Sequence, residues 1–268
     1  MRDGDEWVIS GQKVWNTLAH IADRGMLVAR TDPDVPKHKG LTYFALDMHA
    51  FGVEVRPLRQ MTGEAEFNEV YMSEVRVPDA DRIGDVGDGW RVAMTTLMNE
   101  RSVIGGGGGM PRRGSGAIAE AVRIWKDEVA DHHPAMRDRL MRLWIETEVL
   151  RLTNIRASGN RKAGNPGPEG SIAKLGFAEI NKAVYELCVD LLGPAALEGY
   201  DYTMRRAESL GLVGPPGTAR KMFLRSRANS IEGGTSEIQR SILGERVLGL
   251  PGEPRVDKEL PWSQVARS

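Results

Sequence analysis

Two adjacent glycines near the C-terminus, Gly233 and Gly234, precede residues that can begin a helix and bind an anion. Without a Cβ, they let the backbone pass close to a ligand. Thr235 and Ser236 are helix-capping types, and Gln239 stands three residues after Ser236, the spacing of a capping box. The free N–H groups and positive dipole end of such a helix favour a phosphate or an enolate-like oxygen. A capped helix after an ordinary loop is the alternative that local chemistry leaves open.

A second glycine-rich stretch, Gly105–Gly109, has five consecutive glycines. In a helix they would cost roughly 0.8–1 kcal/mol each relative to alanine, so they either break it or admit a close approach by a backbone or a flat ligand. No Lys-Ser or Lys-Thr follows and no strand is expected before them, which argues against a phosphate-binding loop.

Composition excludes several classes of function. The 268 residues are 41% hydrophobic and carry 36 basic against 37 acidic side chains, so no charge excess favours nucleic acid or an acidic membrane. No apolar stretch approaches the roughly 18 residues of a membrane span, and the N-terminus is too acidic for a signal peptide. The single cysteine, Cys188, lies in an apolar helical pattern and is expected in the core of a cytoplasmic protein. The histidines, including His132 and His133, have no metal-ligand spacing with it, so we expect no metal.

The first part of the chain predicts an antiparallel β domain, because its strands are short, evenly spaced and half-alternating. Trp7–Trp15 predicts a hairpin with its turn near Ser10–Gln12. Because the sequence begins inside a sheet, we expect either a compact β domain or a gene product that lacks its beginning, and we favour the second. Further strands are expected at Met26–Arg30, Leu41–Leu46, Val53–Leu58 and Phe67–Val77.

Proline, glycine and aspartate cluster from Pro78 to Gly89, and we place a domain boundary there, with the β domain at 1–87 and a helical domain at 88–250. An extended tail, 251–268, follows. The fold class is α+β: a sandwich-like or barrel-like antiparallel domain, then a four-helix-type bundle. Helices are expected from Trp90 to Met98 and beyond, from His133 to about Arg161, and at Ser171–Leu192, Thr218–Asn229 and Ser236–Leu248.

One predicted helix carries the seam of a packed bundle. Its apolar residues stand alternately four and three apart, a pattern of core packing more often than of a cofactor site. They are Ala173, Phe177, Ile180, Val184, Leu187 and Leu191.

Four separated stretches resemble the acyl-CoA dehydrogenase family, in the same order, and span nearly the whole chain. They are Trp7–Thr17, Gly63–Val70 with Val75–Pro78, Asp88–Trp90 with Leu97–Arg101, and the Gly-Gly-Thr-Ser-Glu-Ile-Gln-Arg run at Gly233–Arg240. The family's N-terminal helical domain and the first β strand with its flavin loop have no counterpart here. The chain resembles the last two-thirds of such an enzyme.

The resemblance implies a reaction in which a carboxylate removes the α proton of an acyl-CoA thioester while the β hydrogen leaves as hydride to flavin N5. Such a base needs a raised pKa and therefore an apolar, water-poor site. Much of the family places it directly before the Gly-Thr of the C-terminal signature, where this chain has Gly233. A branch similar to isovaleryl- and long-chain-type enzymes places it in a Glu-Arg pair on the first C-terminal helix, so we predict Glu100. The alternatives are Glu232, and a Glu100 that only forms a surface ion pair.

The resemblance also implies an FAD site. Trp15, Asn16 and Thr17 would contact the flavin ring, with Thr17 near N5, although a cross-strand core aromatic is the alternative for Trp15. The start of the last helix would reach the flavin through Thr235, Ser236 and Glu237. Acyl-CoA would be contacted by Met98, Arg101 and Gly234.

A loop that matches one reaching the FAD of a neighbouring subunit comprises Asp190, Leu191, Leu192, Gly193 and Pro194. It departs from the family pattern, since Asp190 stands where glutamine is usual. The family's Arg-x-x-Phe-Gly pyrophosphate clamp is not found either, and Val122–Lys126 occupies its region.

We therefore predict an FAD-dependent acyl-CoA dehydrogenase that assembles as homodimers, tetramers or hetero-oligomers through the bundle and passes electrons to an electron-transferring flavoprotein. The alternative is a non-catalytic partner subunit or truncated remnant that keeps the oligomerisation bundle. The missing domain, the lost clamp and the glycine run favour this alternative.

Overall fold

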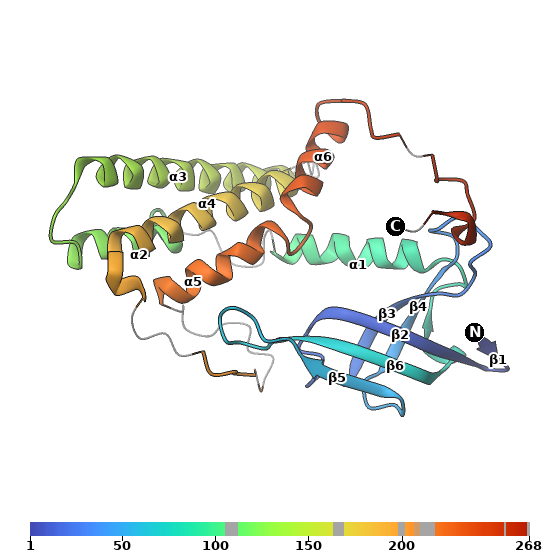
Figure 1. The fold of residues 1–268 in the computed structure, drawn as a ribbon. Helices are drawn as coiled ribbons and strands as arrows, with labels where there is room; N and C mark the ends of the chain where they lie inside the picture. Colours follow the sequence, from blue (N-terminus) through green and yellow to red (C-terminus); the bar gives the residue numbers. More distant parts are fainter. Residues whose placement is uncertain are drawn as a thin grey trace. The chain divides into compact units, whose positions relative to one another are not determined.

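The computed structural model describes residues 1–104, 112–162, 169–197, 202–206, 208, 218–254 and 256–266, with the backbone alone for residues 98–104, 161, 162 and 169 (Figure 1). The chain divides into two compact units. Unit 1, the β unit, comprises Met1–Asn99, Tyr202–Gly211 and Glu253–Ser268. Unit 2, the helical unit, comprises Glu100–Asp201 and Leu212–Gly252.

The β unit contains two antiparallel sheets, ordered β1-β2-β6-β5 and β3-β4-β7 (Figure 1). The long partners β2 and β6 form the centre of the first sheet, and β4 forms the centre of the second. The strands are β1 (Arg2–Asp3), β2 (Glu6–Thr17), β3 (Arg24–Arg30), β4 (Leu41–Asp47), β5 (Val53–Pro57), β6 (Phe67–Pro78) and β7 (Arg82–Ile83).

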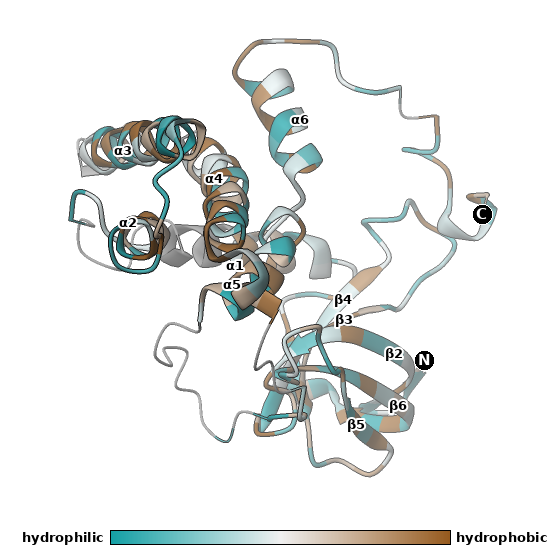
Figure 2. Ribbon diagram, turned by 60° about the vertical axis from the view of Figure 1, so that its left-hand side comes forward, coloured by the Kyte–Doolittle hydropathy of each residue, from teal (hydrophilic) through white to brown (hydrophobic). Residues whose placement is uncertain are grey.

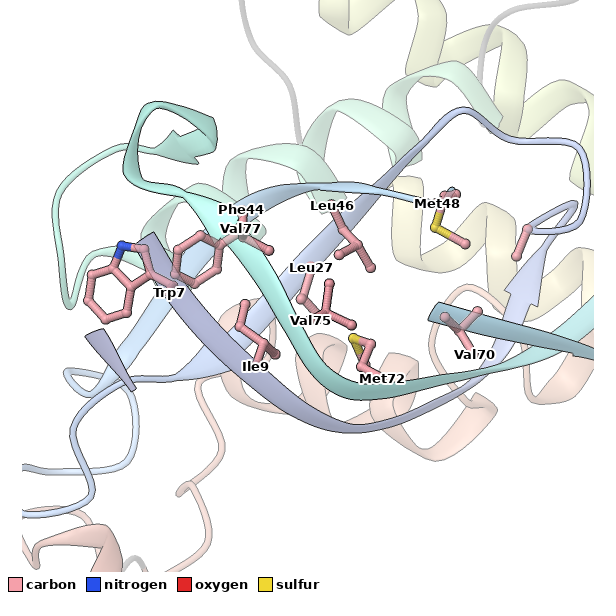
Figure 3. Packing of buried hydrophobic residues seen from close by; sticks show 11 residues of the cluster. Trp7, Ile9, Leu27, Phe44, Leu46, Met48, Val70, Met72, Val75 and Val77 are labelled. Atoms are coloured by element: carbon pink, nitrogen blue, oxygen red, sulfur yellow. The ribbon is translucent and has the colours of Figure 1, made fainter. Parts of the chain in front are cut away.

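Alternation explains the β core. Every second residue of β6 is buried on each side of a bend: Val70 and Met72 before it, Val75 and Val77 after it. The residues between them face outward. These side chains meet those of β2, β3 and β4 (Figure 3). Fully burying each large apolar side chain contributes about 1.5–3 kcal/mol, so this cluster holds the two sheets together. Its members are Trp7, Ile9, Ala19, Leu27, Phe44, Leu46, Met48, Val70, Met72, Val75 and Val77.

The predicted N-terminal hairpin is wrong. Residues 6–17 form one continuous strand, β2, whose two halves both pair with β6. Gly11, which was expected in a turn, instead lies at an irregularity, where the register shifts between Ile9 and Gly11 and the glycine adopts φ 154°. A glycine inside a strand pattern marks a bulge as readily as a turn.

The helices are α1 (Gly89–Ile104), α2 (Ala117–Asp127), α3 (Pro134–Lys162), α4 (Glu169–Leu192), α5 (Ala219–Ser226) and α6 (Ser236–Arg246). Short 3₁₀ turns occur at Asp79–Asp81, Gly193–Leu197, Arg227–Ser230 and Trp262–Gln264. Helix α4 is the centre of the helical unit, because it packs against α2, α3, α5 and α6. Figure 2 looks nearly along α2, α3 and α4 and shows them side by side.

The predicted seam on α4 is largely buried. Val184 and Leu187 are in the helical core, and Ile180 and Leu191 pack against it, whereas Phe177 is exposed. Helix α2 has no counterpart among the predicted helices. Its buried residues Ile118, Ala121 and Ile124 recur every third position, a helical signal that the sequence does contain.

The C-terminal segment joins the β unit. Trp262 N–H donates to the Val35 carbonyl at 2.9 Å, and the Arg30 guanidinium lies 4.3 Å from the centroid of the Trp262 ring. Lys37 and Asp257 form an ion pair at 2.8 Å. Residues beyond the last helix are thus held by side-chain contacts as well as by backbone hydrogen bonds.

Candidate functional site

Strand β2 ends in a strained turn that contains the predicted flavin-side residues. Between Lys13 and Asn16 the pairing with β6 takes up one extra residue on β2, which makes a β-bulge. Trp15 has φ 65° and Leu18 has φ 54°. A left-handed conformation costs a non-glycine residue about 1–2 kcal/mol. Backbone strain of this kind clusters at ligand sites, which makes this turn a candidate site.

The side chains of this turn present a flat surface and a polar atom. Trp15 is 63% exposed, and its ring meets the edge of Phe67 with centroids 5.8 Å apart. Thr17 is exposed beside it. The Asn16 Oδ1 atom is buried and accepts no hydrogen bond from the described residues. Buried acceptors are normally satisfied, so an incoming N–H donor would complete this one. An open indole face next to an unfilled acceptor fits one side of a flavin ring.

The second candidate region is the glycine turn before α6. Gly233 and Gly234 have φ 64° and 91°, so both use the conformational freedom expected of them. The cap differs from the predicted capping box. Thr235 alone is the N-cap, and its Oγ1 accepts from the Ile238 N–H at 3.2 Å. Gln239 does not reach the cap; its Nε2 donates to the Gly233 carbonyl at 3.3 Å.

Helix α4 holds this turn in place. Lys174 Nζ donates to the carbonyls of Asn229, at 2.8 Å, and Gly234, at 2.5 Å. Two turns along α4, Asn181 Nδ2 donates to Asn229 Oδ1 at 2.7 Å. Sequence reasoning missed Lys174, because its hydrogen-bond partners Asn229 and Gly234 lie 55 and 60 residues away along the chain.

Ser236 is the first residue of α6 and ties that helix to α4, since its hydroxyl donates to Glu179 Oε1 at 2.7 Å. Lys182 and then this hydroxyl lower the pKa of Glu179. Burial lowers the pKa of Lys174, against the opposing charges of Glu232, Glu179 and Glu237.

The helix start already stabilises one negative charge. The pKa of Glu237 is lowered by its own backbone N–H and then by the Thr235 hydroxyl. This is the behaviour expected of a carboxylate at the positive end of a helix. The predicted anion preference of this turn is therefore met in part by a residue of α6 itself.

Glu232 is held in a hydrogen-bonded ion pair. Arg225 donates to both of its carboxylate oxygens, at 3.1 and 2.9 Å, and Asn229 Nδ2 donates to Oε1 at 2.8 Å. A proton acceptor in this position would have to leave an arginine fork. The geometry favours a structural role for Glu232, which orders the segment before the glycines.

The predicted base lies on α1. The side chains of Glu100, Met98 and Arg101 fall outside the described residues, as does Gly105–Gly109. Their roles stay predictions.

The Asp190–Pro194 loop offers a flavin pyrophosphate no evident donor side chain. Asp190 forms an ion pair with Arg139 of α3. Leu191 and Leu192 pack against the helical core, while Gly193, with φ 54°, and Pro194 are exposed. The region that lacks the pyrophosphate clamp is α2, where Arg123 pairs with carboxylates of its own unit, Glu120 and Glu128. The structure thus fits a flavin at the β2 turn but shows no anion-binding side chain ready at this loop.

Within the described ranges, no cluster of three or more His, Cys, Asp or Glu side chains could hold a metal ion. Among the same residues, no helix combines the length and apolarity needed to cross a membrane.

Comparison with known proteins gives consistent results. Residues 1–75 match the model of the acyl-CoA dehydrogenase middle domain, and residues 87–248 match that of the acyl-CoA dehydrogenase C-terminal domain. Acyl-CoA dehydrogenase FadE34 of Mycobacterium tuberculosis is 39% identical over 91% of this chain and 31% of its own length. Acyl-CoA dehydrogenase IpdE1 of the same organism is 36% identical over 94% of this chain and 62% of its own length.

The fold of this chain is similar to that of one chain in a solved complex. A chain of the ChsE4-ChsE5 complex from Mycobacterium tuberculosis superposes with a TM-score of 0.73 at 29% identity, over 94% of this chain and 64% of that one. The chain thus spans less than two thirds of the length of these relatives. With both domain models matched along most of its length and relatives above 30% identity, the chain belongs to the acyl-CoA dehydrogenase family, whose members are flavoprotein oxidoreductases.

Proposed function

We propose that this chain takes part in the FAD-dependent α,β-dehydrogenation of an acyl-CoA thioester. The observation that carries the proposal is the turn at the end of β2, where a strained, exposed Trp15 lies beside the unfilled acceptor of Asn16. FAD, when bound, supplies a hydride acceptor at N5. Trp15, Asn16 and Thr17 would orient the ring and keep water from one face.

The proton step falls to a carboxylate of this chain. We propose Glu100 as the base that removes the α proton. Glu232 is the weaker candidate, because both of its oxygens are already hydrogen-bonded to Arg225. Gly234, whose φ of 91° favours glycine, would pass close to the thioester with its backbone. Thr235, Ser236 and Glu237 would lie on the flavin side, and Met98 and Arg101 along the acyl-CoA.

The test compares Glu100→Gln with Glu232→Gln in an assay of acyl-CoA thioesters with an artificial electron acceptor. General-base catalysis contributes about 10²–10⁴-fold, so Glu100→Gln should reduce turnover by at least about a hundredfold while FAD stays bound. Glu232→Gln should lower stability and leave a larger share of turnover. The opposite ranking would transfer the role of base to Glu232.

We further propose that the chain assembles through its helical unit as a dimer, tetramer or hetero-oligomer, and that an electron-transferring flavoprotein accepts its electrons. Helix α3 carries an exposed apolar row of Met141, Ile145, Val149 and Leu152. Residues at these spacings lie on one face of a helix and form the kind of seam by which helices associate. Sedimentation of the purified protein tests this, and a monomer at micromolar concentration would contradict it.

A second candidate function is that of a non-catalytic partner subunit. It is favoured by the pairing of Asp190 with Arg139 and of Arg123 with Glu120 and Glu128, because two arginines near the expected pyrophosphate position are already bound to carboxylates. One solved relative is itself a complex of two differently named chains. The two functions separate on one observation: the dehydrogenase turns over acyl-CoA, whereas the partner subunit does so only together with a second chain that supplies the base.

A further inference from the structure

We propose that Arg206 and Asn68 form a positioning pair that fixes the Trp15–Thr17 turn and thereby tightens FAD binding. The expected change in FAD affinity rests on the proposed function. The expected change in the order of the turn rests only on the hydrogen bonds of Asn68 and Arg206. Asn68 reaches the turn through the Asn16 carbonyl, so the pair acts through the backbone.

Asn68 is the centre of this arrangement. It is fully buried on β6, in register with Asn16. Its Nδ2 donates to the carbonyls of Asn16 and Glu66, both at 3.1 Å, and lies 3.3 Å from His20 Nδ1. Its Oδ1 accepts from Arg206 Nη2 at 3.0 Å. Two carbonyls on one side require the amide nitrogen there, and a guanidinium on the other requires the oxygen. Arg206 therefore selects the amide orientation that holds the turn.

The contacts of Asn68 reach both ends of the strained segment. The Asn16 carbonyl directly follows Trp15, and the Glu66 carbonyl also accepts from the Leu18 N–H at 2.7 Å. Trp15 and Leu18 are the two residues here with left-handed backbones. Such conformations persist only when surrounding contacts over-determine them. Asn68 supplies those contacts from the neighbouring strand.

Arg206 is brought to this place by backbone pairing. Residues 202–206 run beside the turn before β6, where Arg205 N–H donates to the Gly63 carbonyl at 2.9 Å and Ala65 N–H donates to the Arg205 carbonyl at 2.8 Å. The Arg59 guanidinium lies 3.7 Å from the centroid of the Tyr202 ring. All these residues belong to the β unit. A segment from the second half of the sequence thereby sets a turn in the first.

The test uses the whole 268-residue chain and four variants. Arg206→Met removes the donor but keeps an apolar stem, and the matched control Arg56→Met makes the same change at an exposed arginine of this unit that pairs with Glu54. Arg206→Lys restores a cationic donor. Hydrogen exchange of the Leu18 amide is measured without FAD, and FAD affinity is measured by flavin fluorescence.

We expect Arg206→Met to speed exchange at Leu18 and to raise the Kd for FAD about three- to tenfold, the loss of about one hydrogen bond. Arg206→Lys should bring the Leu18 exchange rate and the Kd for FAD most of the way back to the wild-type values. Arg56→Met should change neither quantity. A separate variant, Asn68→Asp, places an oxygen against two carbonyls while keeping the partner of Arg206, and should also speed exchange.

Unchanged exchange in Arg206→Met and Asn68→Asp would overturn the proposal, as would Arg206→Lys behaving like Arg206→Met. If the wild-type protein binds no FAD, the proposed function fails instead, and the exchange measurement alone decides whether Arg206 fixes the turn.

Discussion

Replacing Lys174 by methionine should loosen the glycine turn before α6. The change removes an ammonium that donates to the carbonyls of Asn229 and Gly234, at 2.8 and 2.5 Å. Hydrogen bonds to charged groups contribute about 1.5–3 kcal/mol each. Burial of the ammonium, which lowers the pKa of Lys174, offsets part of this. We expect a net loss of about 2 kcal/mol in the free energy of unfolding.

For a chain of this size, about 2 kcal/mol corresponds to a fall in Tm of about 4–8 °C. Thermal unfolding followed by circular dichroism measures it, and Lys126→Met, at an exposed lysine on α2, serves as the matched control with an expected change within about 0.5 kcal/mol. Hydrogen exchange should show the loss concentrated at residues 229–235. Equal Tm changes in the two variants would refute the view that Lys174 holds this turn.

Two further predictions concern the β unit. Trp15→Gly should be about 1–2 kcal/mol more stable to denaturant than Trp15→Ala, because only glycine relieves the left-handed strain, yet both should lose FAD affinity; equal stability would show that the backbone there is unstrained. Arg82 and then the Trp7 indole N–H lower the pKa of Asp79. Since the folded pKa lies below the unfolded value of about 3.9, the carboxylate stabilises the fold above that pH and loses this effect as the pH falls through the folded value. Asp79→Asn should therefore cost stability at pH 7 and progressively less toward pH 2, as measured by urea unfolding across that range.

The sequence predicted the strands β3 to β6 closely, because each is a short run of strand-forming residues between turn residues, and β6 also alternates between buried and exposed positions. It misplaced the first element, since Gly11 is equally compatible with a hairpin turn and with a bulge in a long strand. It also missed α2. There the helical signal of Ile118, Ala121 and Ile124 follows a stretch rich in glycine and arginine.

The candidate site was predicted by residue type but not by contact. The glycine turn and its threonine cap follow from local chemistry, and the structure moved the cap by only one residue, from Ser236 to Thr235. Lys174, Asn68 and Arg206 act on residues far away in the sequence, so no local spacing reveals them. The left-handed backbone of Trp15 could not be predicted from the sequence either, because tryptophan has no preference for that conformation.

The most direct test of the account is a titration of the purified protein with FAD, followed by fluorescence of the flavin and of tryptophan. The account predicts saturable binding with quenching of the flavin by Trp15, and a weaker, less quenched complex in Trp15→Ala. Absence of binding, or the same affinity and quenching in wild type and Trp15→Ala, would contradict the claim that the turn at the end of β2 receives the flavin.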